Sequence, residues 1–477
     1  MVLDAKQFWR VASANRMSVI VDADDYFRHA RSAMLKARRR IMLIGWDFDA
    51  RIQLVDEPRL ENEPAQVGDF LLWLVERNPD LEVYLLRWDV GAFKTLLKWA
   101  NLHTLVRWMH HPRIHTKLDG FHPTGASHHQ KIVVIDDCFA FCGGIDMTCQ
   151  RWDTREHKDK NDRRVIGGTP YGPWHDATSA LEGPVAAALG ALARDRWKRA
   201  GGRPVHALSV SGDRWPDELE PQFENVEVGI ARTRPKMPGA SEVREIEDLF
   251  VSQIMAAKHN IYAESQYFAS RRIAEAIARR LGEKNGPEIV IINPQSAEGW
   301  LEPVAMDTAR ARLVAALRDR DTHDRFRIYF PRAARGEPIY VHAKIMIVDG
   351  QTLRIGSANM NNRSMGLDTE CDVTISGTGK VGRTITAIRD DLLAEHLGVT
   401  ASKVSAEIEK QGSLIGAIEK LRGRGRSLVP YKVPDLPAIQ EWLADNEVLD
   451  PEDPSEMFEV MTSPGLFRRL RRPKGDR

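Results

Sequence analysis

Two stretches of this 477-residue chain follow one pattern, "HHQKIVVIDDCFAFCGGIDM" at residues 128–147 and "VHAKIMIVDGQTLRIGSANM" at residues 341–360. Each begins with a histidine and a lysine two positions apart and continues with a branched apolar run, an aspartate and a glycine. The matched pairs are 213 residues apart (342 − 129) and are His129/His342, Lys131/Lys344, Asp136/Asp349, Gly143/Gly356 and Met147/Met360. This repetition indicates two structural units built on the same plan.

The apolar run of each stretch predicts a buried strand, because branched apolar residues favour extended backbone. Side chains alternate along a strand, so the histidine and the lysine share one face, about 6 to 7 Å apart. The lysine supplies positive charge and the imidazole can attack phosphorus or move a proton. One such pair alone is more typical of a solvated loop end. The repetition favours two facing strand ends around one phosphate, with no metal required because two ammonium groups neutralise the developing charge.

Asp136 and Asp349 follow the apolar runs, too far along each strand to touch the same phosphate. They are assigned a structural role, such as pairing a basic group or capping a turn.

Helix-like and strand-like patterns alternate around the two stretches. Apolar residues at helical spacing in residues 24–37 precede a strand expected at 41–46, and the same order recurs in residues 67–89, 245–268 and 273–294. Alternation of this kind predicts an α/β fold with a largely parallel or mixed sheet.

The chain is divided into four parts by these patterns. A first half with one motif is expected at 1–200, a connector rich in Gly, Pro and acidic residues at 201–225, and a second half with the other motif at 226–395. Residues 396–477 are expected to form a helical and Pro-rich extension with a basic tail.

Composition excludes several classes of protein. The net charge is +1, from 68 basic and 67 acidic residues, which argues against nonspecific nucleic-acid binding. Four cysteines with no Cys-x-x-Cys pair are interpreted as free thiols in a reducing compartment rather than a zinc site. Neither a signal segment nor a run of about 18 to 20 apolar residues is visible. We expect a cytoplasmic, non-spanning protein, with contact to the inner membrane face left open.

The repeated H-x-K-x-x-x-x-D, followed after six residues by G-S-x-N, resembles the HKD signature of the phospholipase D superfamily. The second copy is complete, whereas the first has Gly144 and Asp146 where the pattern has Ser and Asn. The blocks "GGIDMTCQRWDT", "YGPWHD", "IYAESQYF" and "NNRSMGLDTE" resemble those flanking the motifs in eukaryote-like phospholipase D. The similarity covers roughly residues 20 to 395.

The resemblance implies two similar α/β sandwich domains related by a pseudo-twofold axis, with the active site at their interface, plus a small helical C-terminal extension. It implies a phosphohistidine intermediate, with His129 as nucleophile and His342 as the acid that protonates the leaving alcohol. The reverse assignment stays open. Asp176 and Glu370 resemble the family's orienting acids, because a nucleophilic imidazole needs a carboxylate on its other nitrogen.

Six further residues are expected to contact the substrate: Trp46, Asp146, Glu264, Gln266, Ser357 and Asn359. For the strand that holds Glu264 and Gln266, a core strand with a capping glutamate is the open alternative. His128 and His175 are interpreted as lining or supporting residues.

The activity implied is that of a phospholipase D or phosphatidyltransferase, which cleaves the distal phosphodiester bond of a glycerophospholipid without a metal or cofactor. The expected partners are a phospholipid membrane surface and a water or alcohol acceptor, with no nucleic acid, and the protein is expected to be a monomer. The basic residues at 466–477 fit either an anionic membrane or a solubilising tail. Alternatives are cardiolipin synthase-like transfer, a nuclease, and a non-catalytic lipid-binding module.

Overall fold

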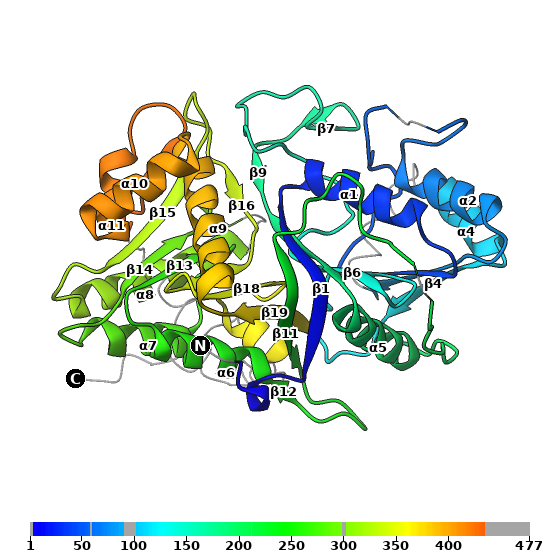
Figure 1. Cartoon of the computed structure of the whole chain (residues 1–477), viewed down its shortest axis with the longest axis horizontal. Coiled ribbons are helices and arrows are strands. Elements are labelled where there is room, and N and C mark those ends of the chain that lie inside the picture. Colours follow the sequence, from blue (N-terminus) through cyan, green and yellow to red (C-terminus); the bar gives the residue numbers. More distant parts are fainter. Residues whose placement is uncertain (1–2, 58–59, 90–101, 211, 298–301, 435–477) are drawn as a thin grey trace, which may run out of the picture.

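One mixed sheet of 16 strands runs through the whole molecule (Figure 1). The computed structural model describes residues 3–57, 60–89, 102–210, 212–297 and 302–434. At the middle of the sheet, β1 (Arg10–Val21) pairs antiparallel with β11 (Phe223–Arg234). The two halves of the chain therefore share a continuous sheet.

Each half adds its strands to the central pair in the same order. Outward from β1 lie β10 (Ala177–Glu182), β6 (Phe139–Gly143), β5 (Ile132–Ile135), β2 (Arg40–Gly45), β3 (Glu82–Trp88) and β4 (Ile114–Asp119). Outward from β11 lie β19 (Glu370–Ser376), β18 (Thr352–Gly356), β17 (Ile345–Val348), β13 (Asn260–Glu264), β14 (Glu288–Ile292) and β15 (Phe326–Arg332). Equal order on both sides of an antiparallel pair confirms the pseudo-twofold α/β architecture.

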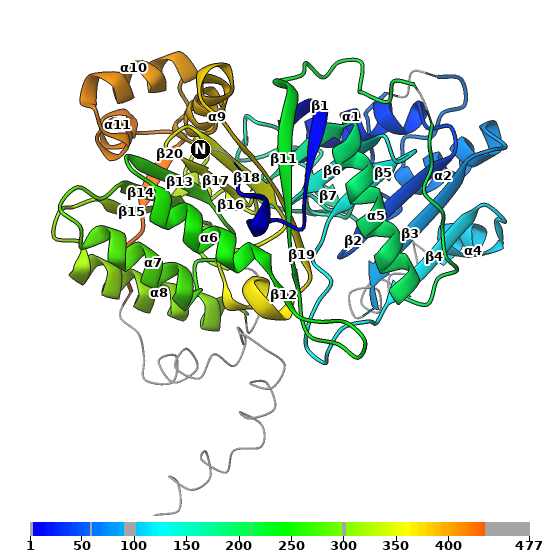
Figure 2. The same cartoon turned by 60° about the horizontal axis from the view of Figure 1, so that its bottom comes forward.

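Helices cover both faces of the sheet (Figure 2). One face carries α5 (Pro184–Arg199), α9 (Gly379–Leu397), α10 (Ala401–Gln411) and α11 (Leu414–Leu421). The other face carries α1 (Ala23–Leu35), α2 (Val67–Arg77) and α4 (Leu102–His110) in the first half, and α6 (Glu245–Ala256), α7 (Arg271–Leu281) and α8 (Glu302–Arg320) in the second. Helix α1 buries its apolar stripe against the sheet, as its spacing predicts.

Several short elements lie outside this frame: η1 (Ala5–Gln7), β7 (Val165–Ile166), β8 (Thr169–Pro170), β9 (Trp174–His175), β12 (Val243–Arg244), β16 (Tyr340–Val341) and η3 (Arg363–Leu367). Of these, β9 and β16, which pair with each other, and η3, which holds Ser364, matter for the site. The predicted connector holds neither helix nor strand between residues 201 and 222, where all positions but 211 are described.

The motif strands β5 and β17 are interior strands, and every residue in them is buried. Asp136 and Asp349, which follow them, adopt left-handed backbone with φ of 52° and 54°. The Asp136 carboxylate accepts hydrogen bonds of 2.7–2.8 Å from the backbone N–H groups of residues 38–40. Asp349 does the same for residues 258–260, at 2.7–2.9 Å. Both aspartates fasten the start of the neighbouring strand, which confirms their structural role.

The C-terminal extension joins the sheet. Its strand β20 (Ser427–Pro430) pairs antiparallel with β15, within the segment predicted to be extended and Pro-rich. The part of the predicted helical and Pro-rich extension from residue 435 on, with its basic tail, lies outside the described residues. Within the described part of the chain, no helix has both the length and the apolar character needed to cross a bilayer.

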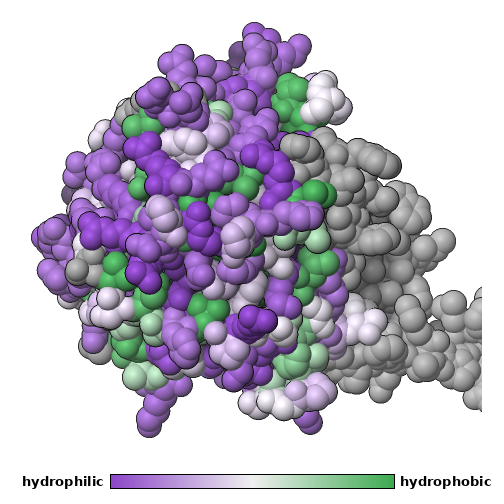
Figure 3. Space-filling view, turned by 90° about the vertical axis from the view of Figure 1, so that its right-hand side faces the viewer, coloured by the Kyte–Doolittle hydropathy of each residue, from purple (hydrophilic) through white to green (hydrophobic). Residues whose placement is uncertain are grey.

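The outer surface of the first half is mostly hydrophilic, with apolar side chains in small separate groups (Figure 3). All four cysteines are free thiols, as predicted, and the sulfurs of Cys142 and Cys371 lie 3.8 Å apart where the halves meet.

Candidate active site

The two motif histidines each contact a carboxylate from the opposite half of the chain. Nδ1 of His129 lies 3.0 Å from both carboxylate oxygens of Glu370. Nδ1 of His342 lies 2.7 Å from Oδ2 of Asp176. The two predicted acids are thus paired crosswise, which leaves Nε2 of each imidazole as the nitrogen available to a substrate.

Two short parallel pairings between the halves produce this crossing. Strand β9, which leads into Asp176, pairs with β16, which leads into His342. A bridge between His128 and Thr369 sets His129 beside Glu370 in the same way. Register alone therefore decides which acid meets which histidine, because one step beyond each bridge brings the two side chains together.

The two motif lysines are buried but have different neighbours. Nζ of Lys131 lies 3.1 Å from Oδ2 of Asp146, a carboxylate. Nζ of Lys344 donates to Oε1 of Gln266 at 3.4 Å, and Nδ2 of Asn359 reaches the same oxygen at 3.5 Å. The first lysine therefore faces a carboxylate, and the second faces the amide oxygen of Gln266.

Electrostatic effects connect the two motifs. Burial and the charges of both lysines lower the pKa of His129 and of His342 well below the usual value for histidine. Burial also lowers the pKa of Lys344 to about 7, although the charge of Asp176 opposes this shift. Without a bound anion, the imidazoles are therefore neutral. Each responds to the lysine of the opposite half, as expected of groups that share one site.

The two orienting acids also differ in acidity. Burial raises the pKa of Glu370 to about 8 and that of Asp176 to about 6. Opposing charge comes mainly from Lys131 at Glu370 and from Lys344 at Asp176. Asp176 is thus the acid whose negative charge is present at neutral pH.

The departure of the first motif from the family pattern is explained by Asp176. A Cβ atom added at Gly144 would lie 2.3 Å from Oδ1 of Asp176, so only glycine fits there. Asp176 accepts its hydrogen bond from the backbone N–H of Ala177, at 2.8 Å. In the second motif, Ser357 stands at this position and its hydroxyl donates to Glu370.

Ser357 does not meet the prediction of a substrate contact. Its side chain is fully buried behind Glu370, where it and Ser364 donate to the two carboxylate oxygens, at 2.7 Å in the case of Ser364. Ser357 is therefore a positioning residue for Glu370. Sequence reasoning missed Ser364, although it lies in the quoted block "NNRSMGLDTE".

The prediction that Glu264 faces the cleft is wrong. Alternation along β13 points Tyr262 and Glu264 to the same side as α9, where the Glu264 carboxylate contacts Nε2 of His175 at 2.8 Å and Nε2 of His396 at 3.0 Å. The strand ends at Glu264, and only beyond it does Gln266 turn toward Lys344. The structure supports the core strand of the open alternative, but Glu264 pairs with two histidines rather than acting as a cap.

Aromatic side chains border the two ends of the site. Trp46 stacks on Trp88 with ring centroids 5.8 Å apart, and its backbone N–H donates to Oδ1 of Asp146 at 3.1 Å. On the other side Trp174 stacks on Tyr340 at 4.5 Å and lies 5.3 Å from the ring of His342. Sequence reasoning missed Trp174 and Tyr340. Trp174 lies in the quoted block "YGPWHD" and could have been found there.

His128 is a supporting residue, as interpreted from the sequence. It is buried, with Nδ1 2.9 Å from Oγ1 of Thr369 and Nε2 3.0 Å from Asp119. Its ring therefore braces the bridge that carries His129.

Comparison with known proteins matches two family models to this chain. The phospholipase D model matches residues 33–227, and the model of the PLD-like domain of cardiolipin synthase matches residues 250–391. The first match thus covers most of the half that holds His129, and the second covers most of the half that holds His342.

Similar curated proteins are phospholipases D. Phospholipase D A of Dictyostelium discoideum is 25% identical over 73% of this chain and 32% of its own length. Phospholipase D alpha 1 of Carica papaya is 24% identical over 77% of this chain and 63% of its own length. This chain thus spans less than two thirds of either relative.

Among solved structures, the phosphatidylserine synthase of Haemophilus influenzae Rd KW20 has a similar fold. Its TM-score is 0.55 at 12% identity, over 91% of this chain and 93% of that one.

Proposed function

We propose that the chain is a member of the phospholipase D superfamily, two models of which match its two halves. We propose further that it cleaves or transfers a phosphodiester group of a glycerophospholipid through a covalent histidine intermediate. The observation that carries this proposal is the crossed pair of His–acid contacts, which presents two Nε2 atoms and two lysines to one place. The named relatives, which are phospholipases D, support a glycerophospholipid as substrate.

In the first step, Nε2 of His129 attacks phosphorus and a P–N bond forms. The P–O bond to the head-group alcohol breaks, and His342 gives its Nε2 proton to the leaving oxygen. The reactive form is the one in which Glu370 has lost its proton; its carboxylate then accepts the Nδ1–H of His129 and stabilises the charge that develops on the ring. Lys131 and Lys344 hold the non-bridging oxygens.

The second step restores the enzyme. His342, now neutral, accepts a proton from water or from an alcohol, whose oxygen attacks phosphorus as the P–N bond breaks. Water yields the phosphatidic acid product, and an alcohol yields a new phosphatidyl ester. The acceptor alone therefore decides between hydrolysis and transfer.

The difference between the acids supports this division of labour. Asp176, with a pKa of about 6, is ionised at neutral pH and stabilises an imidazolium at His342, as a general acid requires. A bound phosphate adds negative charge, which raises the pKa of His342 and of Lys344 again. The charged form of the general acid thus accompanies substrate binding.

The two amides beside Lys344 are suited to hold the phosphate. Oδ1 of Asn359 is buried and has no hydrogen-bond partner among the described residues. Gln266 is fixed by Tyr340, whose hydroxyl accepts from its Nε2 at 2.9 Å. We infer that both amides contact the substrate from the side of the second motif.

Transfer between two phospholipids is the second candidate. It is favoured by the match of residues 250–391 to the PLD-like domain of cardiolipin synthase. It uses the same two steps with a lipid alcohol as acceptor.

We also propose that the protein works as a monomer at the cytoplasmic surface of a membrane, without nucleic acid as substrate. A glycerophospholipid resides in a bilayer, so the site must reach a membrane surface. The near-zero net charge supports a lipid rather than a polynucleotide.

The test is incubation of the purified protein with mixed phosphatidylcholine and phosphatidylethanolamine vesicles, with and without a primary alcohol, and mass spectrometry of the lipids. We expect phosphatidic acid in both samples and phosphatidyl-alcohol only where alcohol is present. His129→Asn is the inactive control. Cleavage of an oligonucleotide with untouched lipid would overturn the proposed substrate.

A further inference from the structure

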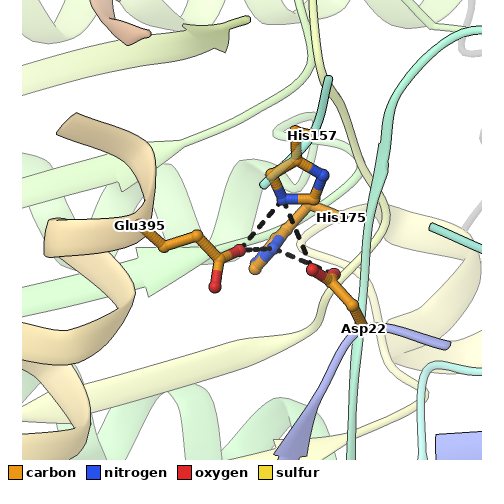
Figure 4. A group of neighbouring side chains, drawn as sticks. All are labelled: Asp22, His157, His175 and Glu395. Atoms are coloured by element: carbon orange, nitrogen blue, oxygen red, sulfur yellow. Dashed lines mark hydrogen bonds and ion pairs between the residues drawn. The ribbon is translucent and has the colours of Figure 1, made fainter. Parts of the chain in front are cut away.

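A second polar cluster lies in the interior next to the active site. Asp22, His157, His175 and Glu395 are all buried, and each offers a ligand atom within 4.8 Å of the other three (Figure 4). They come from four separate places: the end of β1, the loop after β6, strand β9 and helix α9. His175 directly precedes the orienting acid Asp176.

The spacing of the four ligand atoms resembles a tetrahedral metal site. Oε1 of Glu395 lies 3.0 Å from Nε2 of His157 and 2.7 Å from Nδ1 of His175. The two oxygens of Asp22 lie 3.4 and 3.3 Å from the same two nitrogens. Ligand atoms of a tetrahedral zinc ion with bonds of about 2.0–2.1 Å are roughly 3.3 Å apart.

The outer nitrogen of each ring is held by a further carboxylate. Nδ1 of His157 lies 2.9 Å from Oδ2 of Asp153, and Nε2 of His175 lies 2.8 Å from Oε2 of Glu264. Metal-binding histidines typically contact a carboxylate on the nitrogen that does not bind the metal, which fixes the tautomer and the ring orientation. Glu264, which the sequence led us to expect at the substrate, instead orients the ring of His175 in this arrangement.

Asp22 supplies an independent indication of a ligand. It is 1% exposed, and its Oδ2 accepts no hydrogen bond from the described residues although it points toward the two rings (Figure 4). A buried carboxylate oxygen without a donor is costly. A cation between the rings and the two inner acids would satisfy it.

Charge balance also favours a divalent cation. The cluster and its outer partners hold four carboxylates: Asp22, Asp153, Glu264 and Glu395. Arg155, 2.5 Å from Oε2 of Glu395, and Arg164, 3.3 Å from Asp153, neutralise two of them. Protonating both rings would set two buried imidazolium ions, with centroids 5.7 Å apart, against the same oxygen of Glu395. One divalent cation supplies the same charge without that repulsion.

We propose that Asp22, His157, His175 and Glu395 bind one zinc ion in a closed, structural site. Zinc suits two imidazole nitrogens and two carboxylate oxygens in tetrahedral geometry. The site joins β1, β9 and α9, so it fixes β9, which leads into Asp176, relative to both halves. Because the site is closed and structural, it takes no part in the phosphodiester steps.

The test uses the full-length protein without a polyhistidine tag, produced with zinc and dialysed, followed by elemental analysis. We expect about one zinc per chain, and about one cobalt per chain after exchange, with the strong visible absorption of tetrahedral Co²⁺. His157→Gln keeps an amide donor for Glu395 and should hold less than about a tenth as much zinc. His323→Gln, an exposed histidine, is the matched control and should keep the metal.

Two results would overturn this proposal. One is folded wild-type protein that carries no zinc and, after cobalt addition, shows no tetrahedral spectrum; the cluster would then be a pair of imidazolium ions. The other is a folded His157→Gln variant with undiminished zinc. If that variant fails to fold, the wild-type zinc content and the change in melting temperature on chelation decide the question.

Discussion

The two halves of the molecule present the same strand order and the same histidine–lysine pair, yet they surround that pair differently. In the first half, Lys131 faces the carboxylate of Asp146, and Gly144 leaves room for Asp176. In the second, Lys344 faces the amide oxygen of Gln266, and Ser357 supports Glu370. The two halves therefore share the strand order and the histidine–lysine pair, whereas the residues that contact each pair differ. The two imidazoles consequently have different surroundings.

The crossing of the acids gives this difference a physical consequence. The more acidic Asp176, from the first half, serves His342 of the second, and Glu370 serves His129. Neither half holds a complete His–acid pair. The catalytic unit is thus the interface, and a change in one half is expected to act on the histidine of the other.

The largest effect is expected for the histidines. Replacing either His129 or His342 by Asn should lower kcat/KM for phospholipid hydrolysis by about 10³-fold or more, because each removes an essential nitrogen. Vesicle assays with product analysis measure this, and His323→Asn serves as the control. Retention of ordinary turnover by either variant would refute the two-histidine mechanism.

Replacing the structural aspartates Asp136 and Asp349 should lower the stability of the protein rather than its rate, and by different amounts. Asp136→Asn leaves the buried Arg214, whose Nε is 2.8 Å from Asp136, without its ion pair, and should lower the free energy of unfolding by about 3 kcal/mol. Asp349→Asn affects only backbone donors and should cost about 1 kcal/mol. Urea unfolding of the two variants measures the difference. Equal losses would mean that the Arg214 pair adds nothing.

At one matched position, the first motif has Gly144 and the second has Ser357. Replacing Gly144 by Ser should lower the rate more than replacing Ser357 by Gly. Gly144→Ser forces an atom against Asp176 and should lower kcat by about 100-fold, because Asp176 can no longer orient His342. Ser357→Gly removes one hydrogen bond to Glu370 and should cost about tenfold. Steady-state rates of both variants, with circular dichroism to verify folding, test this. The opposite order would contradict the role given to Gly144.

The last effect concerns the dependence of stability on pH. The folded protein keeps the Glu370 proton up to a pKa of about 8, whereas the unfolded chain releases it near the ordinary value of about 4.5. Folding therefore takes up a proton in that range, and stability falls as pH rises through it. Glu370→Gln should flatten the decline up to about pH 8, and Asp176→Asn only up to about pH 6. Melting temperatures across pH measure both windows; identical windows would remove the difference between the acids.

Much of the fold, and the four motif residues of the site, could be predicted from the sequence. The repeated motif identified both histidines and both lysines, and periodic apolar residues identified the strands and helices that carry them. These features are local, because a strand pattern and the residues at its mouth lie within about ten positions of each other. The structural role of Asp136 and Asp349 could be predicted in the same way, because each residue follows the apolar run of its motif strand.

What the sequence could not show depends on contacts between distant segments. The crossed pairing of acids and histidines is set by two very short bridges, β9 with β16 and His128 with Thr369, which have no sequence signal of their own. The side of the sheet to which Glu264 points depends on which face α9 covers. The cluster around His175 assembles residues up to 373 positions apart, from Asp22 to Glu395 (395 − 22).

The division of roles between the two imidazoles is tested most directly with phosphatidyl-p-nitrophenol, whose leaving group departs without protonation. In His342→Asn, His129 should still attack and release p-nitrophenolate, and the phosphatidyl adduct should accumulate on the peptide that carries His129, because the base for the second step is missing. In His129→Asn, neither release nor adduct should occur. An adduct on His342 in the His129→Asn variant, with none on His129 in the other, would contradict the assignment.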